Sequence, residues 1–271
     1  MVSINTNVSS LNSTRLLNVT NSSLNRTTER LSSGLRINRA ADDPSGLFAA
    51  ESFTSEIRGS QAAVGNIQQA TSVVQLADAG LSNIFDALQR MKELAVSASN
   101  GAITADQRNA LNAEYVAIRS SIDSVVNGTT FGGQSLLDGG YGSVTLQVGA
   151  QTTALGTLDL TADYTAGNLV TTANLNSVAN ANTAQGEIDA AITTVASGRA
   201  NLGATISGLD YQKAALEVGV VANTEARSRI QDADIASEVS NLVRQQIAQQ
   251  AGASALSAAN FSTQFVLQLL Q

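Results

Sequence analysis

The chain has 271 residues, a net charge of −7 and only 14% charged residues, so it lacks the cationic surface that nucleic-acid binding requires. It contains no His and no Cys, which excludes disulfides, the usual zinc sites, a Ser-His-Asp triad and any imidazole base. Its first residues lack the leader of a signal peptide and no stretch has the length of a membrane span, so we expect no membrane partner and no secretion by the general route.

The first predicted element is an amphipathic helix over residues 1–33, which ends at Ser33-Gly34. Its apolar residues recur with helical spacing: Ile4, Val8 and Leu11 step by four and three, and they are followed by Leu17, Leu24 and Leu31 at intervals of seven. This stripe buries too little to stabilise an isolated helix, so the element needs a partner.

A second helix is predicted to begin at Pro44, the only proline of the chain, because proline suits the first helical position and Asp43 can cap it. Asp42 and Asp43 could instead form a metal-binding or acid–base pair, but the proline directly after them favours the cap. A heptad seam predicts that the helix runs over about 44–99: Phe53, Ile57, Val64, Ile67, Val74, Leu81, Phe85 and Leu88. Such a helix is about 80 Å long, which is too long for a compact globule.

Two further helices are predicted over about 104–127 and 175–225. Thr104 and Gln107 resemble a capping box at the start of the first one. The two seams consist of Leu111, Tyr115, Ile118, Ile122 and Val125, and of Ile188, Ile192, Val195, Leu202, Ile206, Leu209, Leu216 and Val220. Three helices with such seams predict a bundle.

The middle of the chain follows a different pattern. Val144, Leu146 and Val148 alternate with polar residues, which predicts a β-hairpin over about 140–162. Residues 161–186 are rich in Ala, Asn and Thr and are predicted to form an exposed loop. The glycines between 132 and 142 are not followed by a Lys and open no helix, so a phosphate-binding loop is not expected.

The last predicted helix has an apolar stripe that reaches the chain end. Its residues are Ile235, Val239, Leu242, Val243, Ile247, Phe261, Phe265, Val266, Leu269 and Leu270. An apolar end invites aggregation unless it is covered, and pairing the first helix with the last would bury both stripes. A monomeric bundle with disordered tails is the alternative, and it leaves this end unexplained.

The acidic residues near the start of the last helix have two interpretations. Asp232, Asp234 and Glu238 suit the positive end of the helix dipole, whereas a calcium site would need a glycine and a ligand spacing that are missing. With no His or Cys, the chain is not expected to be an enzyme or to hold a cofactor. Its pattern favours a subunit that assembles with copies of itself.

Two segments carry a resemblance to a known family. Residues 31–47 read LSSGLRINRAADDPSGL, and residues 226–260 read ARSRIQDADIASEVSNLVRQQIAQQAGASALSAAN. Both resemble the conserved blocks of bacterial flagellin, and LQRMKELAVSASNG and LQVGA match further segments of that family. The resemblance covers roughly 1–150 and 185–271, and Pro44 departs from the alanine that is commoner at that place.

The resemblance implies a mainly α fold, namely a long-helix coiled-coil bundle with a small β-hairpin and with paired N- and C-terminal helices. Residues 1–33 and 230–271 would form an inner core, 34–43 and 226–229 a linker, and 44–225 an outer rod. The implied function is the structural subunit of the extracellular flagellar filament, exported unfolded and self-assembling for motility. A hook–filament junction protein and a flagellin with a catalytic insert are the alternatives.

The same resemblance implies partners. These are copies of the chain, the type III flagellar export apparatus, an export chaperone, the filament cap and the hook–filament junction proteins. A flagellin-sensing Toll-like receptor is a further implied partner, through Gln89, Arg90, Glu93, Leu94 and Glu114, although this patch could instead serve packing between subunits. Cytosolic flagellin sensors would use the tail leucines Leu267, Leu269 and Leu270.

Overall fold

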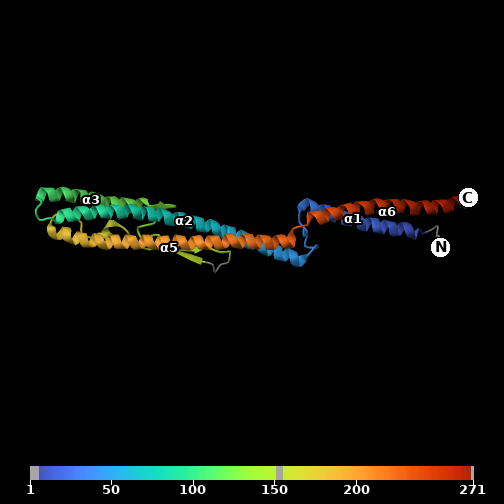
Figure 1. Ribbon diagram of the computed structural model, residues 1–271, viewed down its shortest axis with the longest axis horizontal. Helices are drawn as coiled ribbons and strands as arrows, with labels where there is room; N and C mark the ends of the chain where they lie inside the picture. Colours follow the sequence, from blue (N-terminus) through green and yellow to red (C-terminus); the bar gives the residue numbers. More distant parts are fainter. Residues whose placement is uncertain (1–5, 151–154, 270–271) are drawn as a thin grey trace. The chain divides into compact units, whose positions relative to one another are not determined.

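The computed structural model describes residues 6–150 and 155–269, which form two compact units. One unit comprises the described residues within 1–55 and 222–271, and the other comprises the described residues within 56–221. The helices are α1 (Val8–Ser33), α2 (Pro44–Ser99), α3 (Ala105–Gly128), α4 (Ala166–Leu169), α5 (Val178–Gln231) and α6 (Ile235–Leu269) (Figure 1). The mainly α fold expected from the heptad seams is therefore confirmed.

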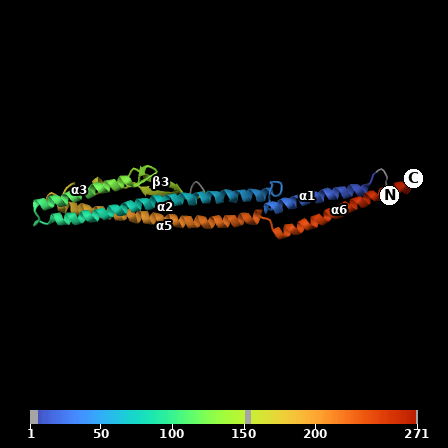
Figure 2. The same cartoon turned by 90° about the horizontal axis from the view of Figure 1, so that it is seen from above.

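In the first unit, α1 and α6 lie side by side and antiparallel (Figures 1 and 2). Polar contacts join them from end to end. The Asn7 side chain donates to the Ala259 carbonyl at 2.9 Å, and the Gln249 side chain donates to Asn21 Oδ1 at 2.7 Å. The pairing of the N- and C-terminal helices is therefore confirmed as well.

Helix α1 ends at Ser33 because Gly34 takes the left-handed conformation, with φ of 72°, which glycine adopts without steric cost. The Gly34 N–H donates to the Arg30 carbonyl at 2.8 Å and so satisfies one of the last acceptors of the helix. At the other end, the Asn7 side chain accepts the N–H of Ser10 and caps α1.

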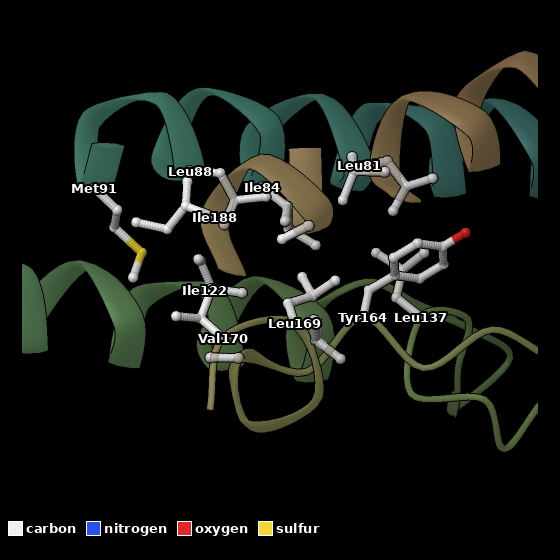
Figure 3. Close-up of a cluster of buried hydrophobic side chains, with 14 of the residues drawn as sticks. Leu81, Ile84, Leu88, Met91, Ile122, Leu137, Tyr164, Leu169, Val170 and Ile188 are labelled. Atoms are coloured by element: carbon white, nitrogen blue, oxygen red, sulfur yellow. The ribbon is translucent and has the colours of Figure 1, made fainter. Parts of the chain in front are cut away.

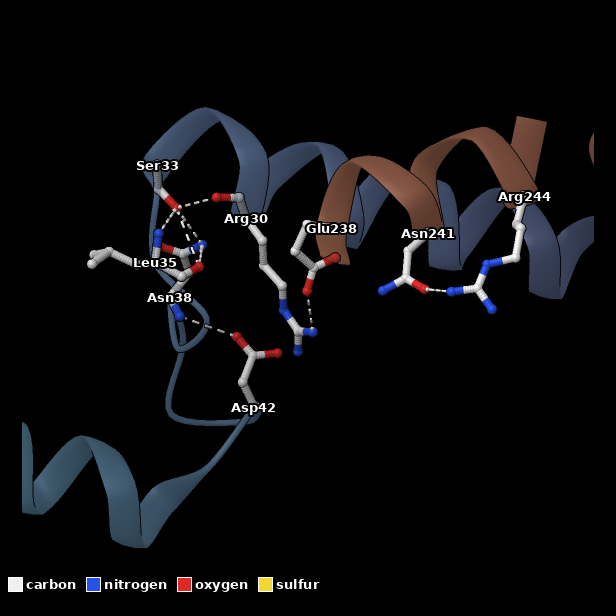
Figure 4. A network of polar contacts seen from close by, with 8 residues as sticks. All are labelled: Arg30, Ser33, Leu35, Asn38, Asp42, Glu238, Asn241 and Arg244. Carbon is white, nitrogen blue, oxygen red and sulfur yellow. Dashed lines mark hydrogen bonds and ion pairs between the residues drawn. The ribbon is translucent and has the colours of Figure 1, made fainter. Parts of the chain in front are cut away.

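A short linker, residues 34–43, follows α1 and pairs with the segment between α5 and α6. The Arg36 N–H donates to the Gln231 carbonyl at 2.7 Å, and the Ala233 N–H donates to the Gly34 carbonyl at 2.9 Å. Asp42 accepts the Asn38 N–H inside the linker, and Asn38 donates to Ser33 at 2.8 Å (Figure 4). The linker is thus held by backbone pairing and by its own side chains.

The C-terminal partner of this linker is not the one expected from the sequence. Residues 226–229, predicted as a linker, lie inside α5, which continues to Gln231. Ala, Arg and Ser allow the helix to continue there, and the chain leaves it only at 232–234. Asp234 then accepts the Ala236 N–H at 3.0 Å and starts α6.

Helix α2 begins where the proline lies. Asp43 Oδ1 accepts the Gly46 N–H and the Ser45 hydroxyl, both at 2.9 Å. These two hydrogen bonds lower the pKa of Asp43, because they favour its charged form. Asp43 is therefore a helix cap rather than a free catalytic carboxylate.

In the second unit, α2, α3 and α5 lie side by side (Figure 2). Thr104 and Gln107 form the capping box at the start of α3. The seams of the three helices meet in one core, whose side chains come from α2, α3, α5 and the segments between them (Figure 3). Its largest fully buried side chains include Leu81, Ile84, Leu88, Met91, Tyr115 and Ile122.

The predicted hairpin is formed by β3 (Gly142–Gln147) and β4 (Leu155–Leu160), which pair antiparallel with Val144 opposite Leu158. It packs on α2 where that helix carries a glycine. A Cβ atom at Gly59 would lie 2.8 Å from the Cβ of Ala150, and Asn66 donates to the Gln147 carbonyl at 3.1 Å. A second pair, β1 (Thr130–Phe131) and β2 (Gln134–Ser135), was not predicted.

The expectation of an exposed loop over 161–186 is wrong. Its first part, which we call the strap (residues 161–177), contributes buried side chains to the core, and the rest belongs to α5, which begins at Val178. The buried side chains of the strap are Tyr164, Ala166, Leu169, Val170 and Leu175 (Figure 3 labels Tyr164, Leu169 and Val170). These apolar residues are too widely spaced among polar ones to give a periodic signal.

Side chains of α3 and α5 hold the strap in place through its backbone. Asp123 accepts the Ala166 N–H at 2.8 Å, and Asn112 accepts the Leu175 N–H at 2.7 Å. Glu187 accepts the Thr172 N–H at 2.7 Å and the Thr171 hydroxyl at 2.6 Å. Burial disfavours the charge of Glu187, but these hydrogen bonds outweigh it and lower its pKa.

Tyr115 makes the stability of the second unit depend on pH in the alkaline range, through its contact with the strap. Its ring is fully buried and its hydroxyl donates to the Thr172 carbonyl at 3.1 Å. Burial raises the pKa of Tyr115 from 10.0 to about 12, so the unfolded chain loses this proton first as the pH rises. The stabilisation is complete below pH 10 and is lost as the pH approaches about 12.

We therefore expect the free energy of unfolding of Tyr115→Phe to be about 1 kcal/mol below the parent at neutral pH, because a hydrogen bond is lost. Near pH 12 this difference should vanish or reverse, since only the parent loses about 2 kcal/mol through this group. Denaturant titrations at both pH values measure the change. Tyr211→Phe, at a residue that is 79% exposed, is the matched control. Its free energy of unfolding should equal that of the parent at both pH values.

Candidate assembly and recognition surfaces

The α1–α6 pair leaves apolar side chains on a side of α6 that α1 does not fully cover. Ile235, Val239, Val243 and Ile247 follow one another every four residues and are between 42% and 61% exposed. Steps of four place them along one side of a helix. Phe261, further along α6, is 69% exposed.

Helix α1 has a similar uncovered line. Val8, Leu11 and Val19 are each more than half exposed, and they share one side of the helix with Arg15 and Arg26. An open groove of about 510 Å³ runs along this side, lined by Leu11, Thr14, Arg15, Asn18, Val19, Ser22 and Arg26. We refer to seven of the exposed apolar residues of the two helices together as the outer stripe: Val8, Leu11, Val19, Ile235, Val239, Val243 and Ile247. Leu16 and Phe261 are exposed too and are not included.

The expectation that pairing the two terminal helices would bury both stripes is wrong for these residues. Each helix of a pair can cover only one side of its partner. In α1 that side includes Leu24, Leu31 and the buried Thr27, and in α6 it includes Leu242 and Glu238. The predicted stripes spanned more than one side, so part of each remains in contact with solvent.

A charged pair lies in the contact between the two helices. Arg30 donates to Glu238 at 3.4 Å, and the carboxylate side chain is only 12% exposed (Figure 4). Asp234 caps α6 and Asp232 accepts the Ser228 hydroxyl, so each carboxylate of the proposed calcium alternative has a structural role. Across residues 6–150 and 155–269, no group of three or more acidic side chains is arranged to hold a metal ion.

Several predicted assembly and sensor residues lie outside what the structure describes. These are Ile4 and Leu270, together with the side chains of Phe265, Val266, Leu267 and Leu269. The backbone of α6 is described through Leu269. Within the described part of the chain, no helix combines the length and hydropathy of a bilayer span.

The predicted recognition patch lies in the second unit, on α2 and α3. Arg90 donates to Glu93 at 2.7 Å and makes two bonds to one oxygen of Glu114, at 2.7 and 2.9 Å. The hydrogen bonds to Glu93 and Glu114 raise the pKa of Arg90, because they favour its charged form. Together with the exposed Gln89, these side chains form an acidic patch in which the only cation is already paired.

Leu94 does not belong to this surface, contrary to the expectation from the sequence. Its side chain is 3% exposed and is part of the bundle core. On α2 it lies one helical turn from Met91 and Ala98 in the row that faces the other helices, and both of these residues are fully buried. An apolar contact from Leu94 to a partner is therefore not available in the folded unit.

Comparison with known proteins agrees with these features. The bacterial flagellin N-terminal helical region matches residues 4–141, and the bacterial flagellin C-terminal helical region matches residues 186–270. Flagellin FlaB2 of Treponema pallidum (strain Nichols) and a flagellin of Halalkalibacterium halodurans are each 37% identical to the chain, and each match covers 99% of both proteins. The crystal structure of Bacillus cereus flagellin is 31% identical, with a TM-score of 0.51, over 55% of this chain and 87% of that one. The chain therefore belongs to the bacterial flagellin family.

Proposed function

We propose that the outer stripe is the surface through which this flagellin, a structural subunit of the extracellular flagellar filament, packs against copies of itself. The observation that carries the proposal is the exposure of Val239, Val243 and Ile247 on a helix that is already paired. Neighbouring copies carry the same exposed apolar residues, so in a polymer these side chains can pack against those of another copy.

The stability of the α1–α6 pair is expected to depend on contacts with neighbouring subunits. In the contact between α1 and α6 the leucines Leu24, Leu31 and Leu242 are only partly buried, and Thr27 is the one buried residue of α1. Covering one exposed Val or Ile contributes about 1–2 kcal/mol, since full burial of such a side chain is worth about 1.5–3 kcal/mol. Ordering two long helices costs conformational entropy, and the apolar burial inside one isolated pair offsets little of it. In the polymer, covering several such residues per subunit offsets the rest.

We assign roles in the filament to the parts of the chain on the same basis. The α1–α6 pair, within residues 1–33 and 230–271, forms the inner core, and the bundle within 44–225 forms the outer rod. Residues 34–43 with 231–233 form the linker, because this is where the backbones pair. The absence of His and Cys from the sequence supports a purely structural role without catalysis or cofactors.

Membership of the flagellin family supports proposals for the remaining partners. We propose that the chain is exported unfolded by the flagellar type III apparatus with an export chaperone. It then assembles under the filament cap, beyond the hook–filament junction proteins. The marginal α1–α6 contact supports unfolded export, because little free energy is needed to keep the terminal segments open.

A seeded polymerisation experiment tests the proposed function. Purified chain is added to short fragments of its own filaments, and elongation is followed by light scattering and electron microscopy. Growth should consume the chain down to a critical concentration that does not depend on the number of seeds. Fragments that fail to elongate in the presence of folded chain would contradict the proposal.

We further propose that the acidic patch of Gln89, Arg90, Glu93 and Glu114 is recognised by a flagellin-sensing Toll-like receptor. Arg90 is half exposed, and its planar group can exchange its present partners for receptor carboxylates. We expect Arg90→Ala to lower receptor activation by the monomer about tenfold, as for an arginine that is a hot spot of the interface. A reporter-cell titration with monomer measures this.

Arg199→Ala is the matched control for the receptor experiment. Arg199 donates to Asp78 at 2.8 Å between α5 and α2 and is 36% exposed, against 51% for Arg90, so its removal breaks a partly exposed ion pair between helices elsewhere in the unit. The control should activate the receptor like the parent. Equal responses from Arg90→Ala and the parent would refute the assignment of this patch, and Leu94 is left unchanged because it belongs to the core.

A further inference from the structure

The turn between α2 and α3 contains an asparagine followed by a glycine. Asn100 directly follows the last residue of α2, and both Asn100 and Gly101 are exposed. The Asn100 side-chain oxygen accepts the Ala102 N–H at 3.0 Å. This hydrogen bond draws electron density from the side-chain carbonyl and so makes its carbon a better electrophile.

The nucleophile that could attack this carbon is the backbone nitrogen of Gly101. Gly101 lies outside both helices, and no backbone hydrogen bond from its N–H is found in the part of the chain that the structure describes. A Cβ atom placed on Gly101 would meet no other atom within 4 Å, so the nitrogen is not crowded by other parts of the chain. Glycine itself adds no side chain that would hinder the approach.

A buried cation acts on the same peptide group. Arg108 is 8% exposed, and its guanidinium donates to the Asn100 carbonyl at 3.5 Å and to the Ala98 carbonyl. The Asn100 carbonyl and the Gly101 nitrogen belong to one amide. A cation on that oxygen favours loss of the N–H proton, because it stabilises the negative charge left on the amide.

We propose that Asn100 is a site of spontaneous deamidation in the folded chain. The deprotonated Gly101 nitrogen forms a bond to Asn100 Cγ, the Cγ–Nδ2 bond breaks, and Nδ2 leaves as ammonia after taking up a proton. Water then hydrolyses the resulting succinimide at either carbonyl, which gives aspartate or isoaspartate. Nothing is oxidised or reduced, and water is the only co-reactant.

The chain contains a second asparagine–glycine pair that serves as an internal comparison. Asn127 and Gly128 both lie within α3, which ends at Gly128. Helical backbone angles hold the Gly128 nitrogen away from the Asn127 side-chain carbon, and the ring can close only after the helix end opens. The same dipeptide should therefore react slowly at 127 and quickly at 100.

The product changes the charge and the backbone of the turn. Either acid adds one negative charge at the C-terminal end of α2, which the helix dipole disfavours and the nearby Arg108 partly compensates. Isoaspartate also lengthens the backbone by one methylene group. An exported subunit that is not replaced would accumulate this change with age, in the unit that carries the acidic patch.

The test is a time course of the purified full-length chain at mildly alkaline pH, followed by peptide mapping and mass spectrometry in heavy-oxygen water. We expect the peptide with Asn100 to convert about tenfold faster than the peptide with Asn127, or more, with mixed aspartate and isoaspartate products. In denaturant, where the helix no longer protects Asn127, the two rates should converge. Equal rates in the folded chain, or an Asn100 that reacts only in denaturant, would overturn the proposal.

Gly101→Ala provides a variant whose folding should be unchanged. Gly101 does not have a positive φ, and there is room for the added methyl group. The methyl group hinders the attack of the nitrogen, so deamidation of Asn100 should slow by about tenfold, while the rate at Asn127 stays the same. An Asn100 rate that is unaffected by this substitution would show that Gly101 is not the nucleophile, and would also overturn the proposal.

Discussion

Replacing Val243 or Ile247 by glutamate is expected to abolish filament formation without unfolding the monomer. Both side chains are about half exposed or more in the isolated chain, so a charge there costs the monomer little. In a polymer that covers them, the same carboxylate would be buried without a partner, which costs several kcal/mol. The critical concentration should therefore rise at least about a hundredfold.

Ala248→Glu is the matched control, because it adds the same charge at an exposed position of α6 that does not belong to the outer stripe. This variant should still form filaments. Sedimentation assays give the critical concentrations, and circular dichroism reports the helix content of each monomer. Filaments of normal length from Val243→Glu and Ile247→Glu would disprove the role of the outer stripe.

Gly80→Ala is expected to destabilise the second unit, whereas Gly65→Ala, fifteen residues earlier in the same helix, is expected to stabilise it. A Cβ atom at Gly80 would lie 2.7 Å from Leu137 Cδ1 and 2.8 Å from Thr129 Oγ1, both of them buried residues. Such overpacking costs about 1–3 kcal/mol and exceeds the gain in helix propensity. A Cβ atom at Gly65 would meet no atom of another part of the chain within 4 Å, so about 1 kcal/mol of helix propensity is gained.

Denaturant titrations of the two variants measure these changes, and their opposite signs make the comparison robust. A larger side chain at position 80, as in Gly80→Val, should lower the free energy of unfolding further, since it adds two more carbon atoms to a filled contact. If Gly80→Ala proved as stable as Gly65→Ala, segment 129–137 would not pack against α2 as described.

The long helices could be predicted because their seams repeat over many turns. Ile67, Val74, Leu81 and Leu88 recur at intervals of seven, and each of them is buried. The start of α2 at Pro44 could also be predicted, since the cap and the proline occupy adjacent positions. A repeated pattern averages out local exceptions, so the predicted bounds of α2 and α3, about 44–99 and 104–127, lie within one residue of those in the structure. The predicted end of α5 at 225 is six residues short.

The strap could not be predicted, because its burial depends on contacts distant in sequence. Glu187 and Asn112 hold its backbone from two other helices, and neither residue carries a local signal of this role. The end of α5 was missed for a related reason. Residues 226–229 suit a helix or a linker equally well, and the pairing of the linker with 231–233 decides where the helix ends.

The candidate surfaces, too, could be predicted only in part from the sequence. The apolar character of the terminal helices was evident from the sequence, but which side faces the partner helix was not, because apolar residues lie on more than one side of each. The line of Val8, Leu11 and Val19 with Arg15 and Arg26 could have been found by plotting these positions on a helical wheel. Leu94 was misassigned because its neighbours Arg90 and Glu93 are exposed, while its own position belongs to the seam.

An electron cryo-microscopy map of filaments assembled from the purified chain tests the central claim most directly. The account predicts that α1 and α6 are ordered and antiparallel, and that Val239, Val243 and Ile247 contact helices of neighbouring copies. The account is contradicted if these side chains face solvent in the filament, or if the terminal helices of one subunit are not paired with each other.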